Sequence, residues 1–239
     1  MQIKDRVWGT HTIDEPVLLD LINTKPVQRL KQIRQMGALN FSLPAKHHNI
    51  TRYEHTIGVV LFLRQLGASL KEQIAGLSHD TPHTAFSHTV DWVFPSDEHD
   101  YHEHHFERIL EASSIPTILN NYGIDYKEIL DEHNFPLLEQ PRPDLCADRI
   151  DYGLRDALTY SKAGTSILQF TDKFTIHDNK IVMTDEESAI KFAYDYLLAD
   201  KEIWSYPKHV GLYYVLAQAI RLGLDNRIIT RDDLFTTDD

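Results

Sequence analysis

Four side chains of metal-binding type stand out in the sequence: the adjacent pair His79-Asp80, the earlier His55 and the later Asp148. The pair falls at the predicted end of a helix, where a turn redirects the second side chain so that both reach one ion. The other two residues lie on helices before and after it. Two imidazoles and two carboxylates suit a borderline or moderately hard divalent ion (Mn, Mg, Fe, Co or Zn), with positions left for water and substrate.

Histidine is the unusual residue type of this chain. There are fourteen, and ten of them lie between His47 and His105, interleaved with helix-forming sequence. Neutral imidazole is the commonest metal ligand and also moves protons near neutral pH. The single cysteine, Cys146, excludes an internal disulfide and argues against a closed structural zinc site. The region therefore predicts an open metal site.

Composition limits the class of protein. A length of 239 residues with 42% hydrophobic and 25% charged residues fits one globular domain, 1–239, with a metal-binding core at about 20–162. No long apolar run or signal pattern occurs, so we expect a cytoplasmic protein that spans no membrane. The net charge of −12 opposes general nucleic-acid binding but allows a small phosphorylated substrate. A homo-oligomer is expected only as the common default.

Apolar periodicity predicts an all-α domain. Helices are expected to begin near residue 16 and to cover 24–37, 53–66, 70–79, 84–92, 101–112, 144–161, 184–199 and 207–222. The one good strand signal lies at 173–184, where Asp178-Asn179 would turn a small β-hairpin. The segment from Val7 to Ile13 is expected to be extended or turned, and the tail from Thr236 to Asp239 to fray. The sequence thus predicts a helical bundle with one small hairpin.

The sequence blocks around the His-Asp pair identify a family far more specifically than the pair itself does. Five blocks occur in order: Pro26-Val27-Gln28-Arg29-Leu30, Thr51-Arg52-Tyr53-Glu54-His55, His79-Asp80-Thr81-Pro82-His83, Phe86-Ser87-His88 and Asp148-Arg149-Ile150-Asp151-Tyr152. In these blocks the chain resembles the HD-domain phosphohydrolases, especially the branch containing deoxynucleoside triphosphate triphosphohydrolases. The likeness runs from about residue 5 to 160 and continues more faintly to Leu222. It implies an HD-domain bundle whose ligands occur in the order His, His-Asp, Asp.

The resemblance also implies roles at the reacting phosphate. The metal would be held by His55, His79, Asp80 and Asp148. Two histidines expected on the next helix, His83 and His88, would donate a proton, contact phosphate or bind a second ion, unless they are simply buried and bonded to backbone. His102 with Glu103 resembles the His-Glu pair that faces the leaving group in many members. The histidines that compete with His102 for this role are His99, His104 and His105.

Substrate contacts are implied by the same likeness. Arg52, one helical turn before the first ligand, would hold a phosphate oxygen. Gln28 resembles a residue that contacts a deoxyribose hydroxyl. Tyr152 and Asp156 share one helix face with the last ligand and would meet the sugar, although a half-buried tyrosine beside a surface carboxylate is the competing interpretation. Tyr206 resembles a later substrate-contacting tyrosine more weakly.

The leading functional hypothesis is hydrolysis of a nucleotide or related phosphate ester, first a deoxynucleoside triphosphate, by attack of metal-activated water on phosphorus. A 5′-nucleotidase and a phosphodiesterase of the same superfamily are the catalytic alternatives. One departure concerns the turn after His-Asp, where the branch usually has a small or aliphatic residue and then Gly. Here Thr81-Pro82 stands instead, and proline removes an amide donor. This departure supports a further alternative, a catalytically silent nucleotide-binding protein.

Overall fold

A computed structural model gives the fold and describes residues 1–41, 50–96 and 100–239. The α-helices within these ranges are α1 (Pro16–Ile22), α2 (Lys25–Arg29), α3 (Arg52–Gln65), α4 (Leu70–Ser78), α5 (Thr89–Val93), α6 (Phe106–Glu111), α7 (Ile115–Asn121), α8 (Ala147–Tyr160), α9 (Glu186–Ala199) and α10 (Pro207–Asp225). Two antiparallel hairpins accompany them: β1 (Gln2–Asp5) with β2 (Gly9–Thr12), and β3 (Phe174–His177) with β4 (Lys180–Met183). The predicted all-α class is confirmed.

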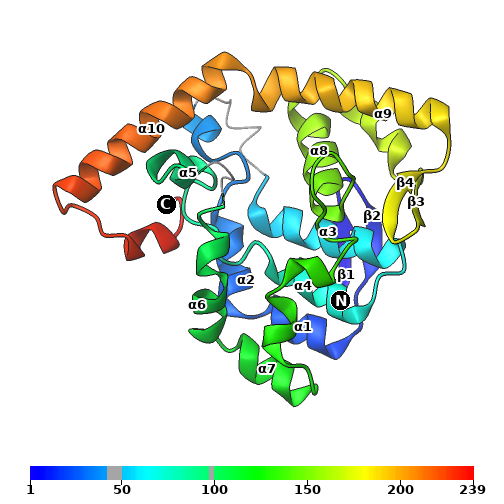
Figure 1. The fold of residues 1–239 in the computed structure, drawn as a ribbon, viewed down its shortest axis with the longest axis horizontal. Helices are drawn as coiled ribbons and strands as arrows, with labels where there is room; N and C mark the ends of the chain where they lie inside the picture. Colours follow the sequence, from blue (N-terminus) through cyan, green and yellow to red (C-terminus); the bar gives the residue numbers. More distant parts are fainter. Residues whose placement is uncertain (42–49, 97–99) are drawn as a thin grey trace.

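Helix α3 forms the centre of the fold. Its residues from Val59 to Leu63 are all fully buried, so the helix is enclosed on every side rather than amphipathic. Helices α4 and α8 pack along it, and the β1–β2 hairpin covers another side, with Trp8 stacked on Phe62 at 4.3 Å between ring centroids. Figure 1 shows α3 in the middle of the bundle. This enclosure fixes the first turn of α3, which carries His55.

Two long helices, α9 and α10, run along one side of the bundle (Figure 1). Helix α9 packs on α8, and α10 packs on α5. A π-helical turn, Asp200–Trp204, connects them; such turns often occur at functional sites. A small second core lies between α10, α5 and a 3₁₀ turn at Asp232–Phe235. The C-terminal segment is thereby brought against the residues that follow α4.

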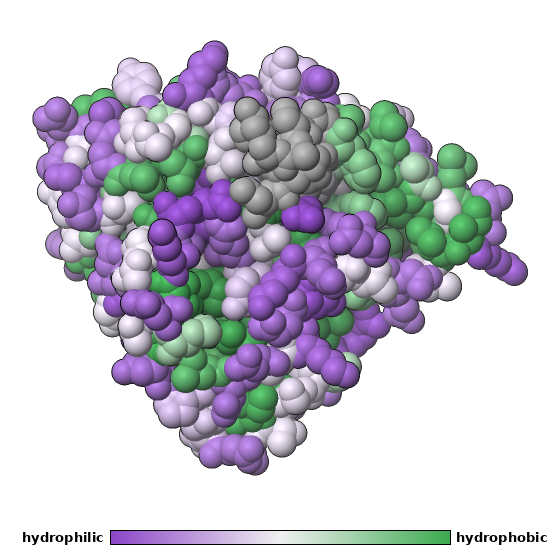
Figure 2. Space-filling view, turned by 180° about the vertical axis from the view of Figure 1, so that it is seen from behind, coloured by the Kyte–Doolittle hydropathy of each residue, from purple (hydrophilic) through white to green (hydrophobic). Residues whose placement is uncertain are grey.

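Apolar side chains remain exposed on α10 and just beyond it. In Figure 2 they gather at the end of the molecule that α10 forms. The most exposed of them are Tyr214, Val215, Leu222 and Ile228. None of the helices in the described ranges is long and apolar enough to cross a membrane. Self-association of the chain stays a prediction.

The structure differs from the predicted elements at several places, including α7, which was not predicted, and the helix expected over 101–112, whose α-helical part begins only at Phe106. The helix expected over 24–37 ends at Arg29, passes through a 3₁₀ turn and becomes extended, so that Arg34 pairs with Thr51. The helix expected over 84–92 begins only at Thr89. The N-terminal hairpin was not predicted, because its strands are too short for alternation to be visible. Its turn is held by Asp5, whose carboxylate accepts two backbone N–H groups, including that of Trp8 at 2.9 Å.

Candidate metal centre and catalytic site

The four predicted ligands come from the ends of three helices. Thr51 caps α3 by accepting the Glu54 N–H, which places His55 in the first turn. His79 is the residue that ends α4, directly after its last helical residue Ser78, and Asp80 lies in the turn that follows. Asp148 is in the first turn of α8, where a carboxylate is favoured by the helix dipole. Helix termini thus aim all four side chains at one point.

The side-chain atoms of these residues lie at the separations that a shared ion requires. His55 Nε2 is 2.8 Å from Asp148 Oδ1, and His79 Nε2 is 3.4 Å from the same oxygen. Ligand atoms of His55, His79 and Asp80 all lie within 4.8 Å of one another. Atoms that bind one ion at about 2.1 Å stand roughly 3–3.5 Å apart. The cluster therefore has the dimensions of a metal site.

An unpartnered nitrogen supports the same assignment. His79 Nδ1 bonds to the Gly76 carbonyl oxygen at 2.7 Å, which turns Nε2 toward the carboxylates. That Nε2 is buried and has no hydrogen-bond partner within the part of the chain that the structure describes. Leaving a buried polar atom unsatisfied is costly, so such an atom calls for a ligand. With Asp80 and Asp148 oxygens beside it, a divalent cation fits this position.

The electrostatics of the cluster favour positive charge. Burial opposes protonation of His55, but hydrogen bonds to Asp148 and Asp151 outweigh burial and raise its pKa to about 10. Burial is likewise outweighed at His79, whose pKa rises to about 9 beside Asp80. Burial would raise the pKa of Asp80 and Asp148, yet the neighbouring cationic groups lower both well below the usual value. A divalent ion would replace the protons on the two rings.

Asp151 is a residue whose role the sequence did not reveal. It is fully buried, and its Oδ2 lies 2.8 Å from His55 Nδ1. Metal-binding histidines usually donate their other ring N–H to such a carboxylate, which fixes the tautomer. A weak signal did exist: Asp151 precedes Arg155 by four residues on one helix face, and the two form an ion pair at 2.8 Å.

Arg52 is bonded to a proposed ligand rather than lying free for phosphate. It is 3% exposed; its Nη1 lies 3.0 Å from both Asp80 oxygens, and its Nε donates to Ser87 Oγ at 3.0 Å. Its Nη2 is buried without a hydrogen-bond partner among the described residues. The guanidinium thus orients Asp80 and keeps one nitrogen for a ligand.

Three histidine rings form a cluster beside Asp80. His83 stacks on His102 with ring centroids 3.7 Å apart, and His88 lies edge-on at 4.9 Å from His83. His83 Nε2 is 3.1 Å from Asp80 Oδ1. The prediction that His83 and His88 share one helix is wrong. His83 lies in the turn after Asp80, and left-handed backbone at Phe86 and Ser87 (φ 60° and 51°) folds His88 back toward it.

A second carboxylate, Asp91, joins this cluster through His88. His88 is half exposed, and its Nδ1 bonds to Asp91 Oδ2 at 2.9 Å; Asp91 is buried. Glu103, expected to support His102, is exposed on a 3₁₀ turn. Burial lowers the pKa of His102 well below its usual value, and the charges of His88 and Arg52 add to this effect. The structure therefore supplies an aspartate–histidine pair that the sequence did not indicate.

The competing histidines fall outside this cluster or outside the described residues. His104 is exposed and pairs with Asp100 at 3.1 Å. The His105 ring packs against Tyr101 and Phe235. His99 lies outside the described residues. Of the histidines that are described here, His102 is the one that joins His83 and His88.

Comparisons with known proteins agree with this arrangement. The HD domain family model matches residues 52–156, which include all four proposed ligands. An uncharacterised protein of Bacillus subtilis, YdhJ, is 43% identical over the whole chain, which spans 73% of that protein. The chain belongs to the HD-domain family of metal-dependent phosphohydrolases. It is a hydrolase of this superfamily, and its cofactor is a divalent metal ion.

Further relatives of this HD-domain protein carry named activities. The metal-dependent phosphohydrolase cns2 of Cordyceps militaris is 37% identical over 88% of the chain, which spans 63% of that protein. The deoxynucleoside triphosphate triphosphohydrolase SAMHD1 of Gallus gallus is 32% identical over 52% of the chain but only 24% of its own length. A crystal structure of a hypothetical Aquifex aeolicus protein shares the fold, with a TM-score of 0.74 and 22% identity; it covers all of this chain, and 69% of that protein is matched.

Two predicted sugar contacts of the HD domain meet an aromatic side chain from the π-helical turn. Trp204 Nε1 donates to Asp156 Oδ2 at 2.9 Å, and its ring lies edge-on to Tyr152 at 5.4 Å. Asp156 is 2% exposed, and its Oδ1 has no hydrogen-bond partner in the described ranges. Burial raises its pKa to about 6, against the opposing effect of the Trp204 N–H. Tyr152 also accepts a hydrogen bond from Tyr196 at 3.0 Å.

The remaining predicted contacts are less well placed for a ligand. Gln28 is engaged at both ends of its amide, donating to the Ile22 carbonyl at 2.6 Å and accepting from Lys31 at 2.7 Å. Gln35, which no feature of the sequence singles out, is buried, and its Oε1 has no hydrogen-bond partner among the described residues. Tyr206 is 44% exposed and caps α10. Gln35 is thus the better amide candidate.

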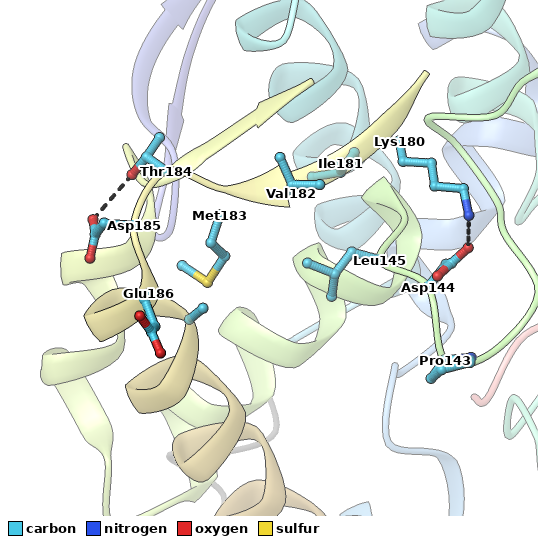
Figure 3. A pocket seen from close by; sticks show the side chains of 11 residues that line it. Pro143, Asp144, Leu145, Lys180, Ile181, Val182, Met183, Thr184, Asp185 and Glu186 are labelled. Atoms are coloured by element: carbon cyan, nitrogen blue, oxygen red, sulfur yellow. Dashed lines mark hydrogen bonds and ion pairs between the residues drawn. The ribbon is translucent and has the colours of Figure 1, made fainter. Parts of the chain in front are cut away.

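A separate hollow of about 510 Å³ lies beside the second hairpin (Figure 3). It is lined by β4, the start of α9 and residues 143–145. Figure 3 shows Leu145 and Met183 facing the same space, while Lys180 reaches Asp144 at 2.6 Å. None of its lining residues is a proposed metal or substrate contact. We assign this hollow no part in the metal site.

Proposed function

We propose that the chain hydrolyses a nucleotide phosphate, with a deoxynucleoside triphosphate as the first substrate to test, at a metal held by His55, His79, Asp80 and Asp148. When bound, a divalent ion at this position acidifies water and draws electron density from a phosphoryl oxygen. The observation that carries the proposal is the three-histidine cluster next to Asp80, because it supplies proton-transfer groups beside the metal ligands.

His88 is the proposed proton donor. Water forms a bond to the α-phosphorus, the bond from that phosphorus to the sugar 5′ oxygen breaks, and the leaving oxygen takes a proton from the His88 ring. The attacking water loses one proton to solvent, and solvent returns a proton to His88 before the next turnover. Asp91, bonded to His88 Nδ1 at 2.9 Å, fixes the orientation of the ring. The products are a deoxynucleoside and tripolyphosphate. Glu103 keeps its predicted supporting role only as a hypothesis.

The phosphate chain would be bound by groups that are neutral or unpaired in the free protein. Burial holds the pKa of His83 and His102 well below the usual value, so both rings are neutral at pH 7 and each has a single N–H. The N–H of His83 is directed at Asp80, so the N–H of His102 is the one that can donate to phosphate. The buried Arg52 Nη2, with no partner among the described residues, offers a charged donor beside them. A triphosphate would satisfy these donors. Tyr152 and Asp156 would contact the sugar. The unpartnered Asp156 Oδ1 would accept a hydrogen bond from a sugar hydroxyl group.

Two alternatives are less favoured by the contacts of the site. A dinuclear phosphodiesterase needs a second cation beside Asp80, but the Arg52 guanidinium already lies 3.0 Å from both of its oxygens and would repel such an ion. The second alternative is a nucleotide-binding protein without catalytic activity, for which the unusual Thr81-Pro82 turn is the sequence argument. That turn is held, however, by Thr81 Oγ1 donating to the Ser78 carbonyl at 2.6 Å, and it leaves the His83 ring against Asp80. The 5′-nucleotidase remains the alternative that product analysis must separate.

The test is product analysis with purified protein, Mn²⁺ and an equimolar mixture of the four deoxynucleoside triphosphates, with phosphorus NMR to identify the phosphates and chromatography to identify the nucleosides. We expect tripolyphosphate and deoxynucleosides, and no turnover by an Asp80→Asn variant. In a parallel reaction with nucleoside monophosphates, release of orthophosphate without any hydrolysis of the triphosphates would identify a nucleotidase and overturn the triphosphate proposal. Tight nucleotide binding without any product would identify a silent binder.

A further inference from the structure

The N-terminal hairpin reaches the metal cluster through one buried hydrogen bond. Trp8 lies in the turn between β1 and β2, is 6% exposed and stacks on Phe62 of α3. Its indole Nε1–H donates to Asp151 Oδ1 at 2.6 Å. The other oxygen of that carboxylate accepts from His55 Nδ1 at 2.8 Å. Two consecutive hydrogen bonds therefore connect a residue near the N-terminus to a proposed metal ligand.

The Asp151 carboxylate is held in a fixed orientation by a buried arginine. Arg155 donates to both of its oxygens, from Nε at 2.9 Å and from Nη2 at 2.8 Å. A guanidinium that donates to both oxygens of one carboxylate has the geometry of an ionised pair. An ionised carboxylate only accepts hydrogen bonds, so His55 must carry its proton on Nδ1. In the neutral, metal-binding form of His55, the Nε2 lone pair then points to the ligand cluster.

Close packing shows how tightly this network is built. A Cβ atom at Gly58, one helical turn after His55, would lie 2.0 Å from Arg155 Nη2 and 2.1 Å from Asp151 Oδ1. Neither approach is sterically allowed, so position 58 accepts only glycine without movement of the network. Arg155 also reaches Asp5 of the hairpin at 3.0 Å. The hairpin, α3 and α8 thus meet at the back of the His55 ring.

We propose that Trp8 is a positioning residue for metal binding, and that its indole N–H, through Asp151, sets the tautomer and ring plane of His55. This inference rests on His55 being a metal ligand, as proposed above. Without the indole donor, Asp151 Oδ1 keeps one partner instead of two, and the carboxylate is freer to rotate. The hairpin is then part of the metal site as well as a cover for the core.

The expected loss of metal affinity depends on how many hydrogen bonds separate the substituted residue from the metal ligand. Loss of a direct outer-shell partner typically weakens metal binding about 10- to 100-fold, which we expect for Asp151→Asn. Trp8 acts one hydrogen bond further out, so Trp8→Phe should weaken binding about fivefold to tenfold. The phenylalanine keeps the ring that stacks on Phe62 and removes only the donor.

The experiment is calorimetric titration of Mn²⁺ into the metal-stripped full chain, without any substrate. Trp92→Phe makes the same chemical change on α5 and serves as the matched control; it should bind like wild type. A second pair compares Gly58→Ala, expected to weaken binding, with Gly211→Ala, whose Cβ has open space around it. Thermal melts of each metal-free variant separate lost folding from lost affinity.

An increased dissociation constant for Trp8→Phe at temperatures where the chain is fully folded supports the inference. A lower melting temperature with an unchanged dissociation constant would reduce Trp8 to a purely structural residue and overturn it. His55→Ala separates the two proposals. If His55→Ala binds Mn²⁺ normally, the ligand assignment fails and this inference with it. If His55→Ala abolishes binding while Trp8→Phe has no effect, only the present inference is wrong.

Discussion

The Asp238 carboxylate accepts the backbone N–H of Phe86 at 2.7 Å, and its second oxygen accepts the backbone N–H of Arg34 at the same distance. The C-terminal segment thereby ties down the left-handed turn between His83 and His88. The prediction that residues 236–239 fray is wrong for this reason. A fraying tail is the usual expectation for exposed polar residues, but here one carboxylate satisfies two partly buried backbone donors.

Removing this tie should disturb the histidine cluster. In Asp238→Ala, the Phe86 N–H loses its partner, and the turn at φ 60° and 51° is expected to relax and move His88. We expect a loss of about 1–3 kcal/mol in the free energy of unfolding and about a tenfold lower kcat. Denaturant titration and steady-state kinetics measure the two effects. Asp239→Ala is the neighbouring control, and an Asp238→Ala enzyme with wild-type kcat would contradict the positioning role.

The His88–Asp91 pair gives a second prediction. His88→Gln removes the proposed proton donor, so kcat should fall about 100-fold or more while KM stays within about twofold of wild type. Asp91→Asn keeps the ring but loses its carboxylate partner, and a smaller loss of about tenfold is expected. The matched control is His104→Gln, because His104 pairs with Asp100 at the surface. A raised KM with unchanged kcat in His88→Gln would assign that ring to binding instead.

Metal affinity should rise with pH. The pKa of His55 is raised to about 10 and that of His79 to about 9 in the metal-free protein, so both rings are protonated at pH 7. An ion must displace these protons, and affinity should increase about tenfold per pH unit for each proton displaced, up to about pH 9. Titration of Mn²⁺ in buffers of different ionisation enthalpy counts the protons released. A pH-independent affinity would contradict the assignment of these rings as ligands.

The same shifts set the pH dependence of the metal-free fold. Both folded-state pKa values lie above the unfolded value of 6.5. The protonated rings therefore stabilise the fold fully below about pH 6.5, and this contribution is lost as the pH rises through 9–10. Denaturant titrations of the stripped protein should show falling stability over this range. Added Mn²⁺ should reverse the fall, because the ion then supplies the positive charge.

Trp204 allows the substrate end of the site to be tested separately. Trp204→Phe removes the donor to the buried Asp156 carboxylate, which should cost about 1–3 kcal/mol of stability. Because this contact lies at the proposed sugar end, we expect a severalfold higher KM for deoxynucleoside triphosphates and little change in kcat. Steady-state kinetics with Trp92→Phe as the control measures the difference. A lower kcat at constant KM would place Trp204 at the reacting phosphate.

Local patterns account for what the sequence could predict. Apolar periodicity is local, so α3, α4, α8, α9 and α10 were predicted near their observed positions. The ligand set followed from an ordered series of blocks, each a helix terminus. The Phe86-Ser87 turn was not predictable, because neither residue is a glycine and nothing local signals positive φ. It was this turn, rather than helical spacing, that brought His83 and His88 together.

The contacts that the sequence could not predict join residues that lie far apart in the chain. Trp8 bonds to Asp151 across 143 residues of sequence, and Asp238 bonds to Phe86 across 152. A single sequence carries no sign of such pairs. The position of Gln28 in its sequence block predicts a sugar contact, but its amide already forms hydrogen bonds at both ends. The Gln35 side chain is buried, and its Oε1 has no hydrogen-bond partner among the described residues. Only the fold shows which of these two glutamines is buried with a free hydrogen-bonding atom, so the sequence could not distinguish them.

The metal content of an Asp148 variant tests the central claim most directly, because Asp148 lies 93 residues from His55 and joins it only in the folded chain. Wild-type protein and Asp148→Ala would be loaded with Mn²⁺, desalted and analysed by inductively coupled plasma mass spectrometry, with Asp144→Ala, a surface carboxylate four residues earlier, as the control. The account predicts about one ion per chain in wild type and control, and less than about a tenth of that in Asp148→Ala. A full complement of metal in Asp148→Ala would contradict it.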